Sequence, residues 1–193
     1  MTPLMVCGGA ENAAAALPGI ASSQPDLAIV DISLGGGSGI DLIRSIRLLY
    51  PNLAVIVLSM HDERVYAERA IRAGARGYIM KRESTTKIVD AIRQVLQGNM
   101  YLSKDLTEIF AEKFVSSPSP GGGLTISQLS DRELEVFQLI GQGYDTREIA
   151  RTLNVNIKTV QTYCTRIKDK LKFTTGSELL REAIRWNESG AAR

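Results

Sequence analysis

The chain has 193 residues, 23% of them charged and 44% hydrophobic, a composition typical of a soluble globular protein with room for two small domains. Its two cysteines lie far apart at no metal-ligand spacing, which argues against a disulfide framework or a zinc site, and its one histidine, His61, argues against histidine-based catalysis. No apolar run is long enough to span a membrane, and no basic residue precedes Glu11 as an export signal requires. The composition therefore predicts a cytoplasmic protein without a membrane partner.

The net charge of +2 is unevenly distributed along the chain. Residues 1–123 carry 12 basic and 12 acidic side chains, whereas residues 124–193 carry 11 and 9. Within residues 147–172 there are seven basic and two acidic side chains, a local charge of +5. A polyanion such as a nucleic acid is expected to bind where positive charge gathers in this way.

The N-terminal part alternates between apolar strands and amphipathic helices, which indicates an α/β fold with a parallel sheet covered on both faces. The predicted strands are 27–30, 54–58 and 78–80, and the predicted helices are 39–49, 64–73, 84–98 and 104–115. Residues 11–22 favour a helix that is interrupted by Pro18 and Gly19, and the glycine-rich segment 35–39 is predicted to be a flexible turn. The Ser, Pro and Gly residues of 116–123 predict a linker to a second domain.

A polar residue stands at the carboxyl end of each of the three predicted strands, namely Asp31, Ser59 and Lys81. Ligands bind at the carboxyl ends of the strands in doubly wound sheets, so these three side chains are expected to converge. A carboxylate there can attack phosphorus, and a hydroxyl and an ammonium can bind the resulting phosphate oxygens. The arrangement suits phosphoryl chemistry.

After the linker every predicted element is a helix. Ser130 and Glu133 form a capping box for the first helix, which stops at 141–143. The others are a short helix at 146–153 with a hydroxyl cap, a turn at 154–156, a helix at 157–171 and a helix from 176 or 177 to about 186. The short helix, the turn and the helix at 157–171 match helix-turn-helix geometry.

The predicted helix 157–171 has two different faces at about 100° per residue. Its apolar stripe consists of Val160, Cys164, Ile167 and Leu171. The opposite face consists of Lys158, Thr162, Thr165 and Asp169, flanked by Gln161 and Arg166. Such a face can approach phosphates and read base edges in a major groove. Pattern and charge alone are equally compatible with a solvated face on a small helical bundle.

The segments LSDRELEV (129–136), IGQGYDTREIA (140–150) and TVQTY (159–163) resemble the LuxR-type DNA-binding domain, and the likeness covers 124–187 without a gap. The resemblance implies that Gln161, Thr162 and Thr165 face bases, that Thr159, Tyr163 and Arg147 contact phosphates, and that Thr146, Lys158 and Arg166 belong to the same surface. The family's usual Lys and His are replaced by Gln161 and Tyr163, so its sequence preference does not transfer. Its fourth helix often pairs two domains, which implies a homodimer on double-stranded DNA.

The segments PDLAIVD (25–31) and AGARGYIMK (73–81) resemble the receiver domain of two-component response regulators of the NarL/FixJ group, a flavodoxin-like, doubly wound fold. The resemblance implies that Asp31 is the phosphorylation site and a ligand of Mg²⁺, that Ser59 and Lys81 bind the phosphate, and that Tyr78 is the switch aromatic. It also implies a sensor histidine kinase and RNA polymerase as partners of a transcription regulator that is not an enzyme.

The start of the chain departs from this family. Residues 6–10 match the second strand of a receiver, so the first strand and helix are missing, together with the adjacent acids that hold Mg²⁺. Either the chain is truncated relative to the natural protein, or the receiver no longer works by phosphorylation; we favour the second because Met1 looks like a genuine start. The predicted organisation is a truncated receiver at 1–103, a helix and linker at 104–123, and a LuxR-type domain at 124–193.

Three rival functions stay open at this point. The first is a regulator switched by phosphorylation of Asp31 despite the missing acids. The second is an aspartyl phosphohydrolase, although such enzymes usually need a second Asp two residues further on, where Ser33 stands. The third is an interaction module that binds no DNA.

Overall fold

The computed structural model describes residues 3–34, 37–115 and 126–191, and the chain divides into two compact units, Met1–Ser119 and Pro120–Arg193. The predicted linker at 116–123 lies outside the described residues. Among the helices in the described ranges, none is long and apolar enough to cross a membrane.

The first unit is built on a parallel sheet in which β4 (Ala54–Ser59) lies between β1 (Leu27–Val30) and β5 (Gly77–Met80). The register places Ile29 of β1 beside Ile56 of β4, so these two side chains lie on the same face. The strands are largely apolar, as is typical of a parallel sheet covered on both faces. All three carboxyl ends meet at one edge, as the predicted α/β fold requires.

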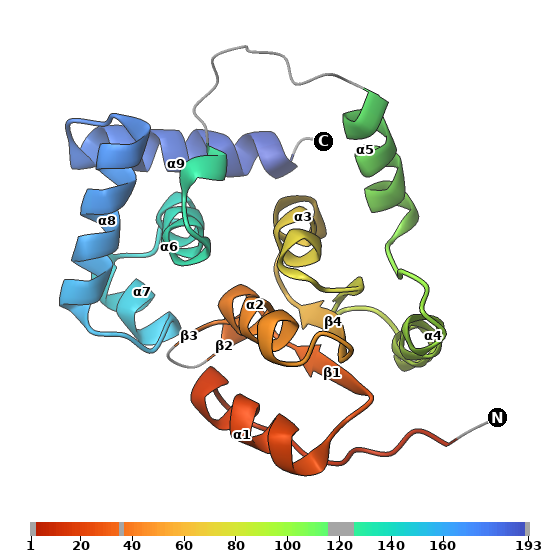
Figure 1. The fold of residues 1–193 in the computed structure, drawn as a ribbon. Coiled ribbons are helices and arrows are strands. Elements are labelled where there is room, and N and C mark those ends of the chain that lie inside the picture. The colour runs from red at the N-terminus through yellow and green to blue at the C-terminus, as the bar shows by residue number, and fades with distance from the viewer. Residues whose placement is uncertain (1–2, 35–36, 116–125, 192–193) are drawn as a thin grey trace. The chain divides into compact units, whose positions relative to one another are not determined.

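Helices lie on both sides of this sheet (Figure 1). They are α2 (Gly39–Leu49), α3 (Glu63–Ala73) and α4 (Thr85–Leu96), and α5 (Lys104–Val115) contacts α3. Ala91 and Val95 of α4 pack against Ile56 on one face. On the other side α2 packs against α3, which also contacts β5 and α5 (Figure 1). This doubly wound arrangement confirms the predicted fold class of the N-terminal half.

The helix before the sheet, α1 (Ala13–Ser23), runs through Pro18, so the predicted interruption there is wrong. Asn12 caps the start of α1 by accepting a hydrogen bond from the backbone nitrogen of Ala15 at 2.9 Å. Proline removes one backbone donor from a helix. The carbonyl of Ala14 that loses this partner belongs to an exposed residue, where water can replace it. The helix therefore survives its proline.

Residues 3–10 form no strand in the structure. The expectation that residues 6–10 form the second strand of a receiver is therefore wrong. All eight of these residues are exposed, including Met5 and Val6. A strand is stable only beside a neighbour that completes its backbone hydrogen bonds, and within the described residues β1 pairs on one edge alone. That open strand carries Ile29, which is 46% exposed.

The glycine-rich segment after Asp31 was predicted to be a flexible turn, but it contains a short antiparallel hairpin of β2 (Ser33–Leu34) and β3 (Gly37–Ser38). Gly39 follows the hairpin and donates its backbone N–H to the carbonyl oxygen of Ile32 at 2.8 Å. A Cβ at Gly39 would lie 2.0 Å from the carbonyl oxygen of Asp31. Only glycine therefore allows α2 to start so close to the acidic residue.

The second unit is all helical, which confirms its predicted fold class. Its elements are the 3-10 turn η1 (Ile126–Gln128), α6 (Asp131–Gly141), α7 (Thr146–Thr152), α8 (Ile157–Leu171) and α9 (Gly176–Ala191). The predicted capping box of Ser130 and Glu133 is present at the start of α6. α9 continues past its predicted end near Trp186. Phe137, Val160 and Ala183 are fully buried where α6, α8 and α9 meet.

The end of α6 lies very close to α9. A Cβ at Gly141 would lie 2.3 Å from the carbonyl oxygen of Ala183. Further along α9, the ring of Trp186 packs edge-on against Phe137 with the ring centroids 5.9 Å apart. Because the chain has one tryptophan, its fluorescence reports on the folding of the second unit alone.

We expect Gly141→Ala to lower the free energy of unfolding of the second unit by about 1–3 kcal/mol, because the added methyl group forces α6 and α9 apart. Urea unfolding followed by Trp186 fluorescence measures this loss. Gly176→Ala is the matched control, since a Cβ there meets nothing within 4 Å. Equal stability of wild type and Gly141→Ala would contradict the close helix contact.

Candidate functional site

The helix-turn-helix consists of α7, the turn at 154–156 and α8, and each helix begins with a side-chain cap. The carboxylate of Asp145 accepts hydrogen bonds from two backbone N–H groups of α7, so the predicted hydroxyl cap is wrong. Thr146 is already the first helical residue, and a cap must stand before it. Asn154 takes the left-handed conformation with φ 51°, and Asn156 accepts from the backbone nitrogen of Thr159 at 2.8 Å to start α8.

The predicted apolar stripe of α8 faces the interior of the second unit. Val160, Ile167 and Leu171 are buried, and Cys164 is half-buried, where burial raises the pKa of its thiol. α8 packs against α6, α7 and α9 through this side. The orientation of the helix about its own axis is therefore fixed by its apolar residues.

The opposite side of α8 is polar and exposed. The exposed residues are Lys158, Gln161, Thr162, Thr165, Arg166 and Asp169, with Thr159 and Tyr163 half-buried. The hydroxyl of Thr162 donates to the carbonyl of Lys158 at 2.9 Å, and that of Thr165 to the carbonyl of Gln161 at 3.1 Å. Of the two predicted contact residues on α7, Arg147 is exposed and Thr146 is half-buried.

The cations of residues 147–172 are largely uncompensated. Lys170 forms an ion pair with Glu133 at 2.6 Å. Within the described residues the other six form no ion pair, and they are Arg147, Arg151, Lys158, Arg166, Lys168 and Lys172. Because no ion pair neutralises these six side chains, their positive charge is available to a ligand.

Glu133 joins α6 to α8. Its Oε2 accepts from the backbone nitrogen of Ser130 at 2.7 Å and from the ammonium of Lys170 at 2.6 Å. Burial by itself raises the pKa of Glu133, but the hydrogen bonds from Lys170 and Ser130 outweigh it and hold the pKa below its usual value. The carboxylate is charged in the folded protein and fixes the C-terminal part of α8 to the start of α6.

The three predicted polar residues of the first unit do come together at the carboxyl edge of the sheet. Oδ2 of Asp31 contacts the ammonium of Lys81 at 2.5 Å, and its Oδ1 accepts from the backbone nitrogen of Ser33 at 3.3 Å. Ser59 is fully buried at the end of the central strand. Both carboxylate oxygens of Asp31 thus have a partner, one of them a full positive charge.

His61 contacts residues of β2, β4 and β5, a role that its sequence position did not indicate. Its backbone nitrogen donates to the hydroxyl of Ser59 at 3.1 Å, and its carbonyl accepts from the hydroxyl of Tyr78 at 2.9 Å. Its imidazole Nε2 lies 2.6 Å from the hydroxyl of Ser33. Burial raises the pKa of Tyr78 far above its usual value, although a hydrogen bond with Ser59 opposes this, so Tyr78 remains a protonated donor.

The residues around Asp31 do not fit a Mg²⁺ ion. Magnesium in proteins is bound by carboxylates together with water or phosphate oxygens. Within the described part of the chain no three acidic, histidine or cysteine side chains gather into a possible metal site. The nearby Asp62 caps α3 through the backbone nitrogen of Arg64 at 2.9 Å, and Glu63 accepts from the hydroxyl of Ser103 at 2.8 Å. Asp31 is left as a lone carboxylate beside Lys81.

The two units together define a class of protein. An all-helical unit with an exposed, cation-rich second helix of a helix-turn-helix is a DNA-binding domain. A parallel sheet with an aspartate, a hydroxyl and a lysine at its carboxyl edge is a receiver-type domain. The chain is a DNA-binding transcription regulator with an N-terminal receiver-type domain.

Comparison with known proteins gives the family. Residues 2–93 match the response regulator receiver domain, and residues 127–183 match the luxR family of bacterial regulatory proteins. The chain is 34% identical over 166 residues to the oxygen regulatory protein NreC of Staphylococcus carnosus, covering 84% of this chain and 76% of that protein. It is 34% identical over 194 residues to the transcriptional activator protein ExaE of Pseudomonas putida, covering 99% and 86%. The chain belongs to the two-component response regulators of the NarL/FixJ type.

Solved structures agree with this assignment. A LuxR-family two-component response regulator from Aurantimonas sp. SI85-9A1 is 30% identical with a TM-score of 0.50, over 54% of this chain and 75% of that chain. RcsB from Salmonella enterica serovar Typhimurium, bound to promoter rprA in the presence of the phosphomimetic BeF3-, is 25% identical with a TM-score of 0.51, over 89% and 81%.

Sequence reasoning did not include Arg151 or His61 among the candidate site residues. Arg151 lies four residues after Arg147 on α7, a spacing that places both on one side of the helix and could have been noticed. The contacts of His61 with Ser33 and Tyr78 join distant parts of the chain, so no local pattern could have indicated them.

We expect Glu133→Gln to destabilise the second unit by about 1–3 kcal/mol at pH 7, because the amide leaves Lys170 without its charged partner. A lowered pKa in the folded state contributes stability above the unfolded pKa of about 4.3, and this contribution is lost as pH falls through the folded pKa. The difference between wild type and variant should therefore shrink below pH 4 in urea unfolding followed by Trp186 fluorescence.

Glu182→Gln is the control for this experiment, since Glu182 pairs with the largely exposed Arg185 on α9. Its cost should stay within about 1 kcal/mol at every pH. A difference between wild type and Glu133→Gln that is constant from pH 7 to pH 3 would show that the charge of Glu133 is unimportant.

Proposed function

We propose that the exposed face of α8 binds the major groove of double-stranded DNA. The proposed base-reading residues are Gln161, Thr162 and Thr165, the proposed phosphate contacts are Thr159, Tyr163 and Arg147, and Thr146, Lys158 and Arg166 flank them. The observation that carries the proposal is a set of six basic side chains around an ordered polar face, none of which forms an ion pair within the described part of the chain. The similar protein RcsB is bound to promoter DNA in its solved structure, which supports DNA binding by this chain.

We expect Thr162→Ala and Gln161→Ala to change the preferred DNA sequence without unfolding the protein, since one good base contact is worth about 1–3 kcal/mol of discrimination. Selection of preferred sites from a random duplex library measures the change. Thr107→Ala on α5 is the matched control, because its hydroxyl makes the same hydrogen bond to a carbonyl four residues earlier. Val160→Asp should instead unfold the second unit by burying a charge. An unaltered preferred site in both α8 variants would refute the docking face.

We also propose that α9 joins two copies into a homodimer. Leu180 and Ile184 are 44% and 37% exposed and lie four residues apart on one side of the helix, while Leu179 and Ala183 are buried on the side that packs against α6. A second copy of the same apolar pair is a self-complementary partner about a two-fold axis. Two helix-turn-helix units would then meet paired half-sites on DNA.

We propose that the first unit acts without phosphorylation of Asp31. Two observations support a closed, non-reactive carboxylate: its ion pair with Lys81, and the finding that no three acidic, histidine or cysteine side chains gather into a possible metal site within the described residues. The rival is a regulator that a sensor histidine kinase switches at Asp31 with Mg²⁺, and the convergence of Ser59, Tyr78 and Lys81 at the same edge favours it. In either case we propose a cytoplasmic regulator that turns over no substrate and has RNA polymerase as its downstream partner.

We expect the full chain to sediment as a dimer at micromolar concentration, with the same size and the same DNA affinity before and after addition of beryllofluoride and Mg²⁺. The reason is that Lys81 already neutralises Asp31. Analytical ultracentrifugation and fluorescence anisotropy check both quantities, with Asp31→Asn as the control. A monomer that dimerises with the phosphate mimic, in wild type but not in Asp31→Asn, would establish the phosphorylation switch instead.

A further inference from the structure

One acidic side chain lies within the otherwise basic and polar face of α8. Asp169 comes four residues after Thr165 and eleven after Lys158, so at about 100° per residue all three share one side of the helix. Asp169 is exposed, and within the described residues it forms no ion pair, although Arg166 stands three residues before it. The residues proposed above to contact DNA do not include Asp169, and a phosphate repels its negative charge.

The position of Asp169 is unfavourable for the helix itself. α8 spans Ile157–Leu171, so Asp169 belongs to its last turn. The C-terminal end of a helix carries a partial negative charge, which stabilises basic side chains there and destabilises acidic ones. Lys168 and Lys170 in the same turn follow this rule, whereas Asp169 breaks it. A residue that breaks a local rule without an evident structural gain is a candidate for a functional role.

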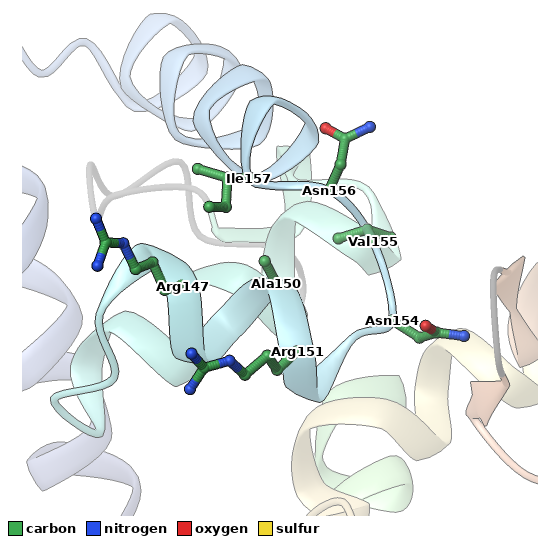
Figure 2. Close-up of a pocket in the computed structure, with 7 residues that line it drawn as sticks. All are labelled: Arg147, Ala150, Arg151, Asn154, Val155, Asn156 and Ile157. Carbon is green, nitrogen blue, oxygen red and sulfur yellow. The ribbon is translucent and has the colours of Figure 1, made fainter.

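The two ends of α8 differ in the charge around them. At the start of the helix, Ile157 lines a hollow of about 460 Å³ together with Arg147 and Arg151 of α7 (Figure 2). Figure 2 shows both guanidinium groups extending to the same side of α7, and the next residue of α8 is the basic Lys158. Near the end of the helix, the residue opposite the buried stripe is instead the acidic Asp169. Attraction to a DNA backbone is therefore strongest at the start of α8.

The length of α8 places Asp169 beyond the groove when the start of the helix lies inside it. Recognition helices contact base edges with their N-terminal residues, and the proposed base-reading residues Gln161, Thr162 and Thr165 all precede Asp169. At a rise of 1.5 Å per residue, Asp169 lies about 16 Å along the axis from Lys158, whereas a major groove is about 12 Å wide. If the full length of α8 lies against DNA, the carboxylate therefore meets a phosphate strand at the edge of the groove.

We propose that Asp169 is a specificity-determining residue, which opposes docking of the whole length of α8 on the phosphate backbone and leaves the N-terminal half of the helix to bind closely. The inference rests on the proposed function, since it assumes that α8 enters the major groove. Binding to unrelated duplexes depends on attraction between basic side chains and phosphates, so this repulsion weakens it most. On the preferred site, base contacts hold α8 by its start, where Asp169 is remote from them.

The test compares the full-length wild type with Asp169→Asn, Asp169→Glu and Asp90→Asn in anisotropy titrations. The two duplexes are of equal length, one with the preferred site selected from a random library and one with an unrelated sequence. Asp90 is an exposed acid on α4 of the first unit and gives the matched loss of one negative charge. Asp169→Glu keeps the charge at the same place.

We expect Asp169→Asn to bind the unrelated duplex about threefold more tightly at low salt, which corresponds to the repulsion of two unit charges about 6 Å apart in water. The gain on the preferred site should be smaller, and both gains should shrink as salt screens the repulsion. Asp169→Glu and Asp90→Asn should match wild type on both duplexes. Urea unfolding followed by Trp186 fluorescence should show no loss of stability in Asp169→Asn, because the end of α8 loses an unfavourable charge.

An unchanged affinity of Asp169→Asn for the unrelated duplex would overturn the proposal, as would an equal gain on both duplexes. A less stable Asp169→Asn would make Asp169 a structural residue, and a changed preferred sequence in a repeated selection would make it a base-reading residue; either result also overturns the proposal. None of these results touches the proposed function. That function fails only if the wild type binds no duplex or if Thr162→Ala and Gln161→Ala leave its preference unaltered.

Discussion

A single carboxylate oxygen, Oε2 of Glu133, holds together the part of the molecule on which DNA binding depends. It completes the cap of α6 through Ser130 and at the same time binds Lys170 near the end of α8. α8 is further held by its buried apolar stripe, so the helix can neither rotate about its axis nor move away from α6. A helix that presents side chains to a groove must be rigid in this way, because a base contact tolerates only small errors of position.

The charged residues of the two candidate sites differ in how far they are paired. In the first unit the reactive-looking carboxylate of Asp31 is neutralised by Lys81, and the neighbouring acids cap a helix or bind a hydroxyl. In the second unit one of the seven basic residues of 147–172 is paired with an acid, and within the described residues the other six form no ion pair. Around α7 and α8 there is thus a group of basic side chains that no ion pair neutralises within the described residues.

Much of this arrangement could be predicted from the sequence because it depends on local patterns. The apolar strands, the capping box of Ser130 and Glu133 and the two faces of α8 follow from residue spacing within one element, and the structure has all of them. The convergence of Asp31 and Lys81 also followed, since the carboxyl ends of parallel strands meet at one edge.

Other features could not be predicted because they depend on what lies nearby in space. Pro18 was expected to break a helix, but the carbonyl it leaves unpaired is exposed to water. Residues 3–10 include apolar side chains, yet they form no strand and are exposed. Lys170 looked like another cation for DNA, and only the position of Glu133 shows that it is occupied.

The hydroxyl groups of Thr162 and Thr165 have a consequence for what α8 can offer a base. Each spends its hydrogen on a carbonyl of its own helix, so that outside the helix it presents only oxygen lone pairs and a methyl group. At these two positions the face is complementary to the exocyclic amino groups of adenine and cytosine and to the methyl group of thymine. Hydrogen donors come instead from the side chains of Lys158, Gln161 and Arg166 around them. The exposed surface of α8 therefore presents both hydrogen-bond acceptors and donors. The acceptor character at Thr162 and Thr165 results from the hydrogen bond that each hydroxyl donates to a carbonyl of its own helix.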